Sequence, residues 1–164
     1  MLIQMRAWRE CTFHRATLVA ACVASLSALL TALIGLAPWV MFVGWVAFFT
    51  RPPTWQNALS AGLCSGLGFV LAIGAAHLIG GLMPVIGVLS FACAVFVCAF
   101  AVVSLRVIPW VNNLAAWFIG MIAFFAAHPP LHADSLAVYL AIIWLGVFSG
   151  WLTVFIQQWF TRPA

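Results

Sequence analysis

Residues 38–55 read PWVMFVGWVAFFTRPPTW, and this short apolar stretch decides the fold. The stretch begins with a proline, which suits the first turn of a helix. Its apolar part ends before Arg51, and two more prolines follow the arginine. The residues between Pro38 and Arg51 are too few to cross about 30 Å of hydrocarbon at about 1.5 Å per residue. The stretch therefore predicts either a partial helix that ends at depth, followed by irregular backbone, or a short span in a locally thinned bilayer.

The same motif returns in the second half of the chain. Pro-Trp-Val stands at 38–40 and again at 109–111, 71 positions later. Further motifs after Pro-Trp-Val also recur, with extra residues inserted between them in the second half of the chain. The later matches are Ala47-Phe48-Phe49 with Ala123-Phe124-Phe125, Pro52-Pro53 with Pro129-Pro130, and Gly62-Leu63-Cys64-Ser65-Gly66 with Gly146-Val147-Phe148-Ser149-Gly150. Motifs that recur in the same order predict an internal repeat.

Composition places most of this chain in lipid. The sequence is 67% hydrophobic and 5% charged over 164 residues, and no soluble domain of this size can bury that much apolar surface. A spanning helix needs about 20 mostly apolar residues. The six expected spans are roughly 16–36, 38–50, 57–79, 84–104, 109–127 and 136–160. We therefore expect an all-α polytopic membrane protein, a single membrane domain over residues 1–164, without a soluble catalytic domain.

The basic residues predict the orientation of the chain in the membrane. With six spans, all of them fall at one set of helix ends, while the loops near 36–38, 80–83 and 128–135 carry none. Because basic residues collect on the cytoplasmic side, we expect both termini in the cytoplasm and residues 1–15 at or near the membrane surface. The topology-determining residues are Arg6, Arg9, Arg15, Arg51, Arg106 and Arg162. This distribution is ordinary for a protein whose partner is the lipid bilayer, so nucleic-acid binding is not expected.

The repeat and the orientation together predict an inverted architecture. Residues 16–79 and 84–160, in round terms, each contain three spans, so the second unit enters the membrane upside down relative to the first. Inverted repeats of this kind place a solute route at the interface between the two units, near the membrane midplane.

Two glycine pairs predict close helix packing. In Gly62-x-x-x-Gly66 and Gly146-x-x-x-Gly150, the small residues let another helix backbone approach. A serine precedes the second glycine of each pair, so the serines flank the same contacts. A functional interpretation stays open beside the structural one: the third and sixth spans cross at the centre, and the serine hydroxyls face a solute route.

Two polar residues mark helix starts. Thr54 follows Pro52-Pro53, and Asp134 precedes the apolar run of the last span. Both side chains commonly cap helix N-termini, so we expect them at the starts of the third and sixth spans.

The scarce charged residues argue against catalysis. Glu10 and Asp134 are expected on opposite sides of the membrane, so they cannot form an acid–base pair, and no enzymatic activity is expected. No charged residue stands in the middle of a span, which argues against a proton relay or an ion-coupled site. His128 and His132 share a loop with Asp134, but two intervening prolines disrupt the helical spacing that would bring such ligands together. Neither a metal nor a cofactor is therefore expected.

Polar and aromatic side chains at matched positions define the candidate solute route. Asn112 and Asn113 follow Trp110 inside the expected span 109–127, where unsatisfied amides would be costly. These amides and the two serines are the expected contacts of a polar neutral solute, and the phenylalanine pairs would form narrow gates. Trp144 and Trp151 share a helix face and would line the route, with ordinary packing of the indoles as the alternative. The candidate route residues are Ser65, Asn112, Asn113, Ser149, Phe48, Phe49, Phe124, Phe125, Trp144 and Trp151.

The stretch at 38–55, Pro-Trp-Val followed by Phe-Phe-x-Arg-Pro-Pro-Thr-Trp, resembles the small YcdZ-like inner-membrane proteins of bacteria. The resemblance covers most of the chain by length and topology. It implies a multi-pass protein of the bacterial inner membrane and carries over no catalytic or binding residue, because that family has no assigned function. The proline-tryptophan helix followed by a small-residue helix also faintly resembles exporters of the fusaric-acid type, which usually carry large soluble regions that this chain lacks.

Three functions follow as expectations. The first is a channel or facilitator for a small neutral or weakly polar solute, acting as a homo-oligomer, with its path between the two repeats. The absence of an intramembrane charge favours a passive route over a pump. The alternative is a non-transporting membrane scaffold or partner subunit, in which the glycine faces are contacts and the tryptophans are anchors. A more distant alternative is a small exporter related to the fusaric-acid type.

Overall fold

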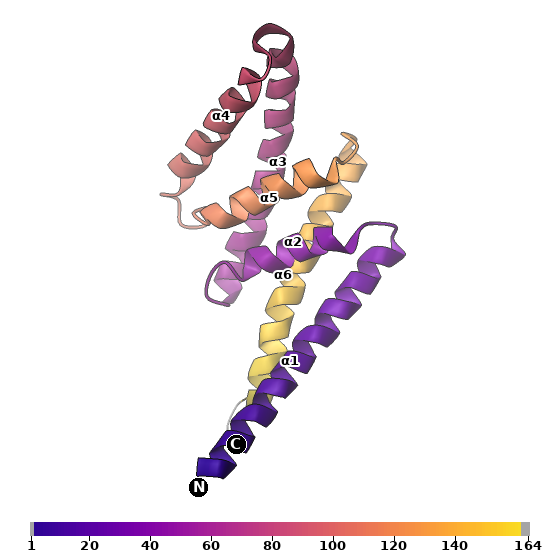
Figure 1. Cartoon of the computed structure of the whole chain (residues 1–164), viewed down its shortest axis with the longest axis vertical. Coiled ribbons are helices and arrows are strands. Elements are labelled where there is room, and N and C mark those ends of the chain that lie inside the picture. The colour runs from indigo at the N-terminus through magenta and orange to yellow at the C-terminus, as the bar shows by residue number, and fades with distance from the viewer. Residues whose placement is uncertain (1, 162–164) are drawn as a thin grey trace.

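The computed structural model describes the backbone of residues 2–161 and the side chains of residues 13–159. Throughout this part of the chain the regular structure is helical (Figure 1). The described helices are α1 (Leu2–Leu33), α2 (Pro38–Phe48), α3 (Trp55–Ile86), α4 (Leu89–Leu105), α5 (Leu114–Ala127) and α6 (Ala133–Thr161). The all-α class predicted from composition is confirmed.

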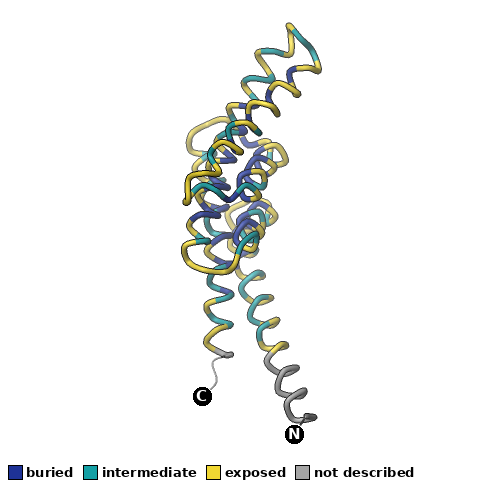
Figure 2. Tube along the Cα trace, turned by 90° about the vertical axis from the view of Figure 1, so that its left-hand side faces the viewer, coloured by how far each residue is buried: buried dark blue, intermediate teal, exposed yellow. Residues whose placement is uncertain are grey.

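Three of the described helices are long and apolar enough to cross a membrane. They contribute the segments Phe13–Leu33, Trp55–Ile86 and Ala133–Trp159. Helices α2, α4 and α5 are also apolar but have only 11, 17 and 14 residues. At about 1.5 Å per residue α2 is only about 17 Å long, as its sequence predicts. Exposed residues follow the outside of the molecule (Figure 2), and many of them are large and apolar, which identifies a membrane protein.

The helices form two arms joined by a central crossing region. Helices α1 and α6 lie side by side in one arm, and α3 and α4 meet at the opposite end (Figure 1). Between the arms, α2 packs against α6 and α5 packs against α3. Buried residues gather in this central region, whereas the described parts of the arms farther out are mostly intermediate or exposed (Figure 2). The core therefore lies where the short helices α2 and α5 cross the long helices.

Polar residues cap or begin three of the helices. Thr54 accepts a hydrogen bond from the backbone N–H of Asn57 at 3.2 Å, so the cap predicted for the third span is confirmed. Asn113 caps α5 in the same way, accepting from the N–H of Ala116 at 3.3 Å. Asp134 lies in the first turn of α6, where a negative charge suits the helix N-terminus.

The boundaries expected for the third, fourth and fifth spans are wrong. The span expected at 57–79 ends later and the span expected at 84–104 begins later, because α3 continues through Pro84 to Ile86 and the chain turns at Gly87. The loop expected near 80–83 therefore lies within α3. Gly87 has a φ of 57°, in the left-handed region that glycine tolerates. The span expected at 109–127 also begins later, because residues 109–113 form turns and irregular backbone before α5.

Glycines let α2 and α6 touch backbone to backbone. A Cβ on Gly44 would overlap the carbonyl oxygen of Ile143, and a Cβ on Gly146 would overlap that of Met41. Gly146 is therefore a close-packing residue, as its sequence context predicts, and its partner is the short helix α2.

Helices α3 and α5 cross in the same way. A Cβ on Gly120 would overlap the carbonyl oxygen of Ser65, and a Cβ on Gly68 would overlap that of Trp117. The glycine-pair pattern in the sequence picks out neither Gly68 nor Gly120. Both crossings thus bring glycine from each of two helices to the contact, and together they form the centre of the core.

Candidate functional site

Two loops meet in a polar cluster at one edge of the core. Residues 49–54 join α2 to α3, and residues 106–113 join α4 to α5. Arg51 donates from Nη1 to the Asn112 Oδ1 at 2.6 Å and from Nη2 to the Asn112 backbone oxygen at 2.7 Å. Asn113 donates from Nδ2 to the Thr50 Oγ1 at 2.8 Å. We name Thr50, Arg51, Asn112 and Asn113 the polar latch, because they tie the two loops together.

The polar groups of the latch are held in place by neutral partners. The Thr50 hydroxyl donates to the carbonyl oxygen of Ala47 at 2.7 Å. Asn113 is 2% exposed and uses its Oδ1 for the α5 cap. Within the described side chains, residues 13–159, no carboxylate pairs with Arg51. The latch therefore carries an uncompensated positive charge at the junction of two loops.

The two asparagines of the latch lie outside the helix in which the sequence analysis expects them. The sequence predicts Asn112 and Asn113 inside the span 109–127, but the structure places both before α5. Both side chains have partners, so the cost of unsatisfied amides in lipid is avoided. The sequence assigns Arg51 only to topology, because its pairing with Asn112 joins residues 61 positions apart. The irregular backbone predicted at Arg51-Pro52-Pro53 was the available signal for an unusual site.

The two candidate serines lie in separate contacts, apart from the latch. Ser65 is buried in α3, where its hydroxyl donates to the carbonyl oxygen of Ala61 at 2.7 Å. Ser149 is buried in α6, where its Oγ lies 2.7 Å from the Oγ of Ser27 on α1. The structure therefore does not bring the serines and the asparagines to one surface.

Ser149 belongs to a row of buried hydroxyls between α1 and α6, which we name the hydroxyl seam. Its members are Ser27, Thr31, Ser149 and Thr153, none of them more than 5% exposed. Thr31 donates to the carbonyl oxygen of Ser27, and Thr153 to that of Ser149, both at 2.9 Å. Further along the same contact, Gln157 donates to the carbonyl oxygen of Ala16 at 2.7 Å. Helices α1 and α6 are thus joined by polar contacts, which lipid chains cannot replace.

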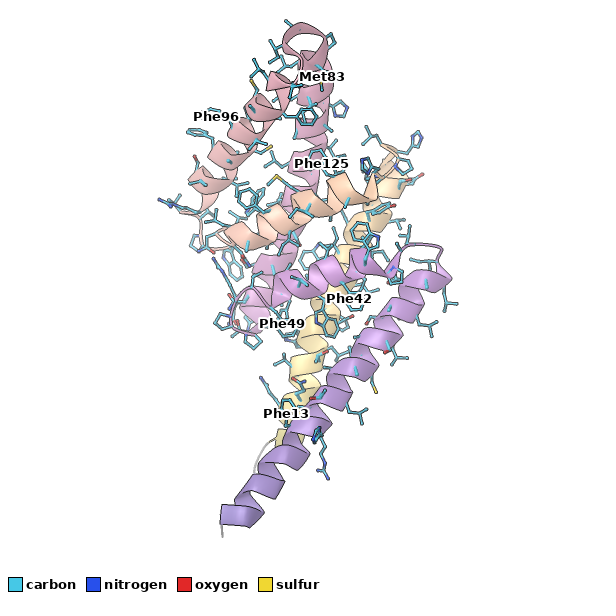
Figure 3. All side chains as sticks on the ribbon, in the orientation of Figure 1. Phe13, Phe42, Phe49, Met83, Phe96 and Phe125 are labelled. Atoms are coloured by element: carbon cyan, nitrogen blue, oxygen red, sulfur yellow. The ribbon has the colours of Figure 1, made fainter. Side chains whose placement is uncertain are left out.

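The phenylalanine pairs are split between the core and the outer surface. Phe48 and Phe124 are 0% and 6% exposed, whereas Phe49 and Phe125 are 47% and 40% exposed. Figure 3 marks Phe49 at the end of α2 and Phe125 on α5. Inside, Phe124 packs edge-on against Phe69 with ring centroids 5.4 Å apart. The four candidate gate residues therefore do not line one common surface.

A tryptophan covers one of the predicted glycine faces. A Cβ on Gly62 would overlap the six-membered ring of Trp144, and a Cβ on Gly66 would lie 3.9 Å from the Trp144 Nε1. This face therefore receives an indole ring instead of a helix backbone. Trp144 and Trp151 share a face, as predicted, and together with Trp55 they line an open apolar cavity of about 220 Å³.

The other arginines lie apart from the latch. Arg15 and Arg106 are exposed. The side chains of Arg6 and Arg9, and the whole of Arg162, lie outside the described residues. Of the three arginine side chains that the structure describes, Arg51 alone bonds to another element. Across the described part of the chain, no three His, Cys, Asp or Glu side chains gather closely enough to hold a metal ion.

The apolar helices, the glycine crossings and the polar latch define the class: an all-helical membrane protein with short helices at its centre. Residues 17–158 match the family described as "Protein of unknown function (DUF1097)", and the chain belongs to this family. Comparisons with curated proteins and with solved structures find no match. The resemblance noted for the stretch at 38–55 predicts a family without an assigned activity, and this family is one. The narrower YcdZ-like label stays a prediction.

Proposed function

We propose that this protein is a channel or facilitator for a small neutral or weakly polar solute in the bacterial inner membrane. In this proposal, α1–α3 and α4–α6 are two units of inverted topology, both termini face the cytoplasm, and the protein acts as a homo-oligomer. The proposal rests mainly on one observation: the crossing of α2 with α6 and the crossing of α5 with α3 are built in the same way, with a glycine from each helix at the contact.

The short helices support a repeat because they use equivalent residues. In α2, Met41 and Gly44 meet α6, and in α5, Trp117 and Gly120 meet α3. Each of the α5 residues stands 76 positions after its α2 counterpart. The same offset relates the two Ala-Phe-Phe motifs of the sequence, so contacts and sequence agree on this part of the repeat.

The long helices support the repeat at a slightly different offset. Ser65 and Gly68 of α3 receive α5, while Ile143 and Gly146 of α6 receive α2, and the α6 residues stand 78 positions later. The contacts therefore favour Gly68, and not Gly62, as the counterpart of Gly146. Each short helix packs on the long helix of the other unit, which is the exchange expected of two inverted units related by a two-fold axis.

The contacts also support the proposed orientation. The start of α1 and the end of α6 lie at the same end of the molecule (Figure 1). The latch joins the loop that carries Arg51 to the loop that begins with Arg106. A cytoplasmic face that contains the ends of α1 and α6 and both of these loops satisfies the preference of basic residues for that side.

The glycine crossings are closed in this conformation. Backbone meets backbone at Gly44 and at Gly120, with no room for a Cβ between the helices. Passage of a solute between the units therefore requires α2 and α5 to shift relative to the long helices. The proposal accordingly places the opening of the route in a movement of the two short helices.

Solute flux in proteoliposomes tests the proposal. The purified protein would be reconstituted, and entry of urea, glycerol and a series of weak acids would be followed by stopped-flow light scattering. We expect at least one of these solutes to enter faster than it enters protein-free liposomes of the same lipid. Equal rates for every solute would contradict a channel or facilitator.

The packed interior favours a second candidate function, a scaffold or partner subunit that transports nothing. Among the described residues, every buried side-chain nitrogen and oxygen has a hydrogen-bond partner. A rigid, satisfied interior suits a protein whose outer surface binds another membrane protein. Affinity purification that yields one stoichiometric partner, together with no flux in the liposome assay, would favour this function over the first.

A further inference from the structure

We infer that the polar latch is a binding site for a small oxyanion, which takes the place of the Asn112 carboxamide on the Arg51 guanidinium. The ligand chemistry is a carboxylate or phosphate group. This inference goes beyond the proposed function, because the anion can bind whether or not any solute crosses the membrane.

The first support is a positive charge that has no negative partner among the described side chains, residues 13–159. Arg51 is partly buried, and both acceptors of its hydrogen bonds, the Oδ1 and the backbone oxygen of Asn112, are neutral. Asp134, the acidic residue whose side chain the structure describes, is exposed in the first turn of α6. A guanidinium at a partly buried position attracts an anion more strongly than one in bulk water, because the local dielectric constant is lower.

The second support is the geometry of the two hydrogen bonds. Nη1 of Arg51 donates to the Asn112 carboxamide at 2.6 Å, and Nη2 donates to the Asn112 backbone oxygen at 2.7 Å. An oxygen of a carboxylate or phosphate can accept from Nη1 in place of the carboxamide, while Nη2 keeps its bond to the backbone oxygen. One present acceptor belongs to the side chain of Asn112, which is only partly buried and can rotate away. Because a charged oxygen makes a stronger hydrogen bond than an amide oxygen, an anion can displace it.

The third support is that the surroundings stay fixed during this exchange. Asn113 is held by its bond to Thr50 and by its role as the α5 cap. On the other loop, Asn57 donates from Nδ2 to the carbonyl oxygen of Pro52 at 2.7 Å, which fixes the turn after the arginine. These bonds do not involve the exchanged groups, so the loops keep their shape when an anion replaces the carboxamide.

Thermal unfolding in a detergent without phosphate groups tests the site. The protein in dodecyl maltoside would be titrated with sodium acetate, with sodium chloride keeping the ionic strength constant. We expect a saturable rise in Tm with acetate, because a ligand that binds the folded state stabilises it. Arg51→Gln should abolish this rise. Arg106→Gln, which removes an exposed arginine from the neighbouring loop, is the matched control and should keep it.

The source of the anion is decided by a second titration. Phosphatidylglycerol added to the same detergent presents a phosphate on a lipid headgroup. A saturable rise in Tm with this lipid and not with acetate, again lost in Arg51→Gln, would assign the site to a lipid headgroup. A rise with acetate assigns it to a free anion. No saturable rise with either ligand would overturn the inference.

Asn112→Ala separates a binding site from a purely structural contact. Removing the competing carboxamide frees the guanidinium, so the affinity for acetate should rise roughly tenfold, in keeping with the strength of a charged hydrogen bond. The same variant should unfold at a lower temperature without acetate, because the latch is weakened. An unchanged or lower affinity for the anion in Asn112→Ala would overturn the inference, even if Arg51→Gln fails to fold.

Discussion

The glycine residues within the helices of this protein have very different surroundings. Gly44 and Gly120 each face a carbonyl oxygen of the helix they cross, whereas nothing lies within 4 Å of a Cβ placed on Gly74. Spacing along the sequence reports which residues share a helix face, but it does not report what covers that face. For this reason the glycine-pair pattern selects Gly62, which an indole ring covers, and misses the glycine at position 68 of the same helix.

Alanine substitutions at the crossings test this difference. Gly44→Ala and Gly120→Ala are each expected to lower the free energy of unfolding by about 1–3 kcal/mol or to prevent folding, because the added methyl group overlaps a backbone oxygen. Gly74→Ala on α3 is the matched control and should unfold at the same or a higher temperature, because alanine favours helix. Tryptophan fluorescence during heating measures all three. Equal stability of the three variants would contradict the close crossings.

Of the latch residues, the two asparagines can be recognised from the sequence, but their partners cannot. Asn112 and Asn113 stand out in an apolar sequence, so their need for partners is predictable. Their partners are not, since Arg51 and Arg106 both look like ordinary arginines at the ends of membrane helices. The contact between the loops depends on how α2 and α5 are placed, and that placement is a property of the whole core.

For whole helices, a start that has a local signal is easier to predict from the sequence than a start within an apolar stretch. Pro38 and Thr54 identify the beginnings of α2 and α3, because each has a local role in a first turn. The boundaries of the fourth and fifth spans are wrong for two reasons. Pro84 suggests a break, but a proline near the end of a long membrane helix is tolerated. Residues 107–111 are also apolar, so composition does not separate them from the following helix.

The cap of α3 gives a prediction for one helix end. Thr54→Ala removes the acceptor of the Asn57 N–H and is expected to lower the free energy of unfolding by about 1 kcal/mol. Thr17→Ala is the control, because Thr17 bonds to the carbonyl oxygen of Phe13 inside α1 and caps nothing. Chemical unfolding of the two variants measures the difference. A larger loss in Thr17→Ala than in Thr54→Ala would argue against the cap.

The hydroxyl seam gives a prediction for a pair of helices. In a variant whose native cysteines are changed to alanine, Ser27→Cys together with Ser149→Cys should form a disulfide under mild oxidation, because the two hydroxyl oxygens are 2.7 Å apart. Ser25→Cys with Ser149→Cys is the control, because Ser25 is exposed on α1 and should not pair. Mass spectrometry of the digested protein detects the cross-link. Equal cross-linking of both pairs would show that α1 and α6 are not fixed in this register.

For the molecule as a whole, composition alone establishes the membrane class, while the arrangement depends on contacts. The matched motifs stand at offsets of 71, 76, 77 and 84 positions, and the sequence alone does not choose among them. The contacts of the short helices select 76, and those of the long helices give 78. In the proposed repeat, the shift from 76 to 78 lies in the second short helix, because four residues follow Gly44 in α2 and seven follow Gly120 in α5. The loop between α5 and α6, residues 128–132, is one residue shorter than the loop between α2 and α3, residues 49–54. The proposed repeat is therefore better judged from the crossings than from the motifs.

Single cysteines at exposed loop positions test the proposed orientation. In a cysteine-free variant, Val88→Cys and Leu131→Cys should react with a membrane-impermeant maleimide added outside intact cells. Pro53→Cys and Val107→Cys should react only after the inner membrane is opened. All four positions are exposed, so a difference in labelling reports the side of the membrane. Outside labelling of Val107→Cys together with Val88→Cys would contradict the inverted arrangement.

The start of α1 and the end of α6 lie at the same end of the molecule (Figure 1), and this has a practical consequence for counting subunits. Two copies of the gene can be fused in tandem through a short hydrophilic linker, with no added membrane helix. Such a concatemer fixes the ratio of normal to altered copies within one polypeptide. Comparing a fused pair that carries one defective half with a pair that carries two would show whether each copy works by itself or only alongside a neighbour.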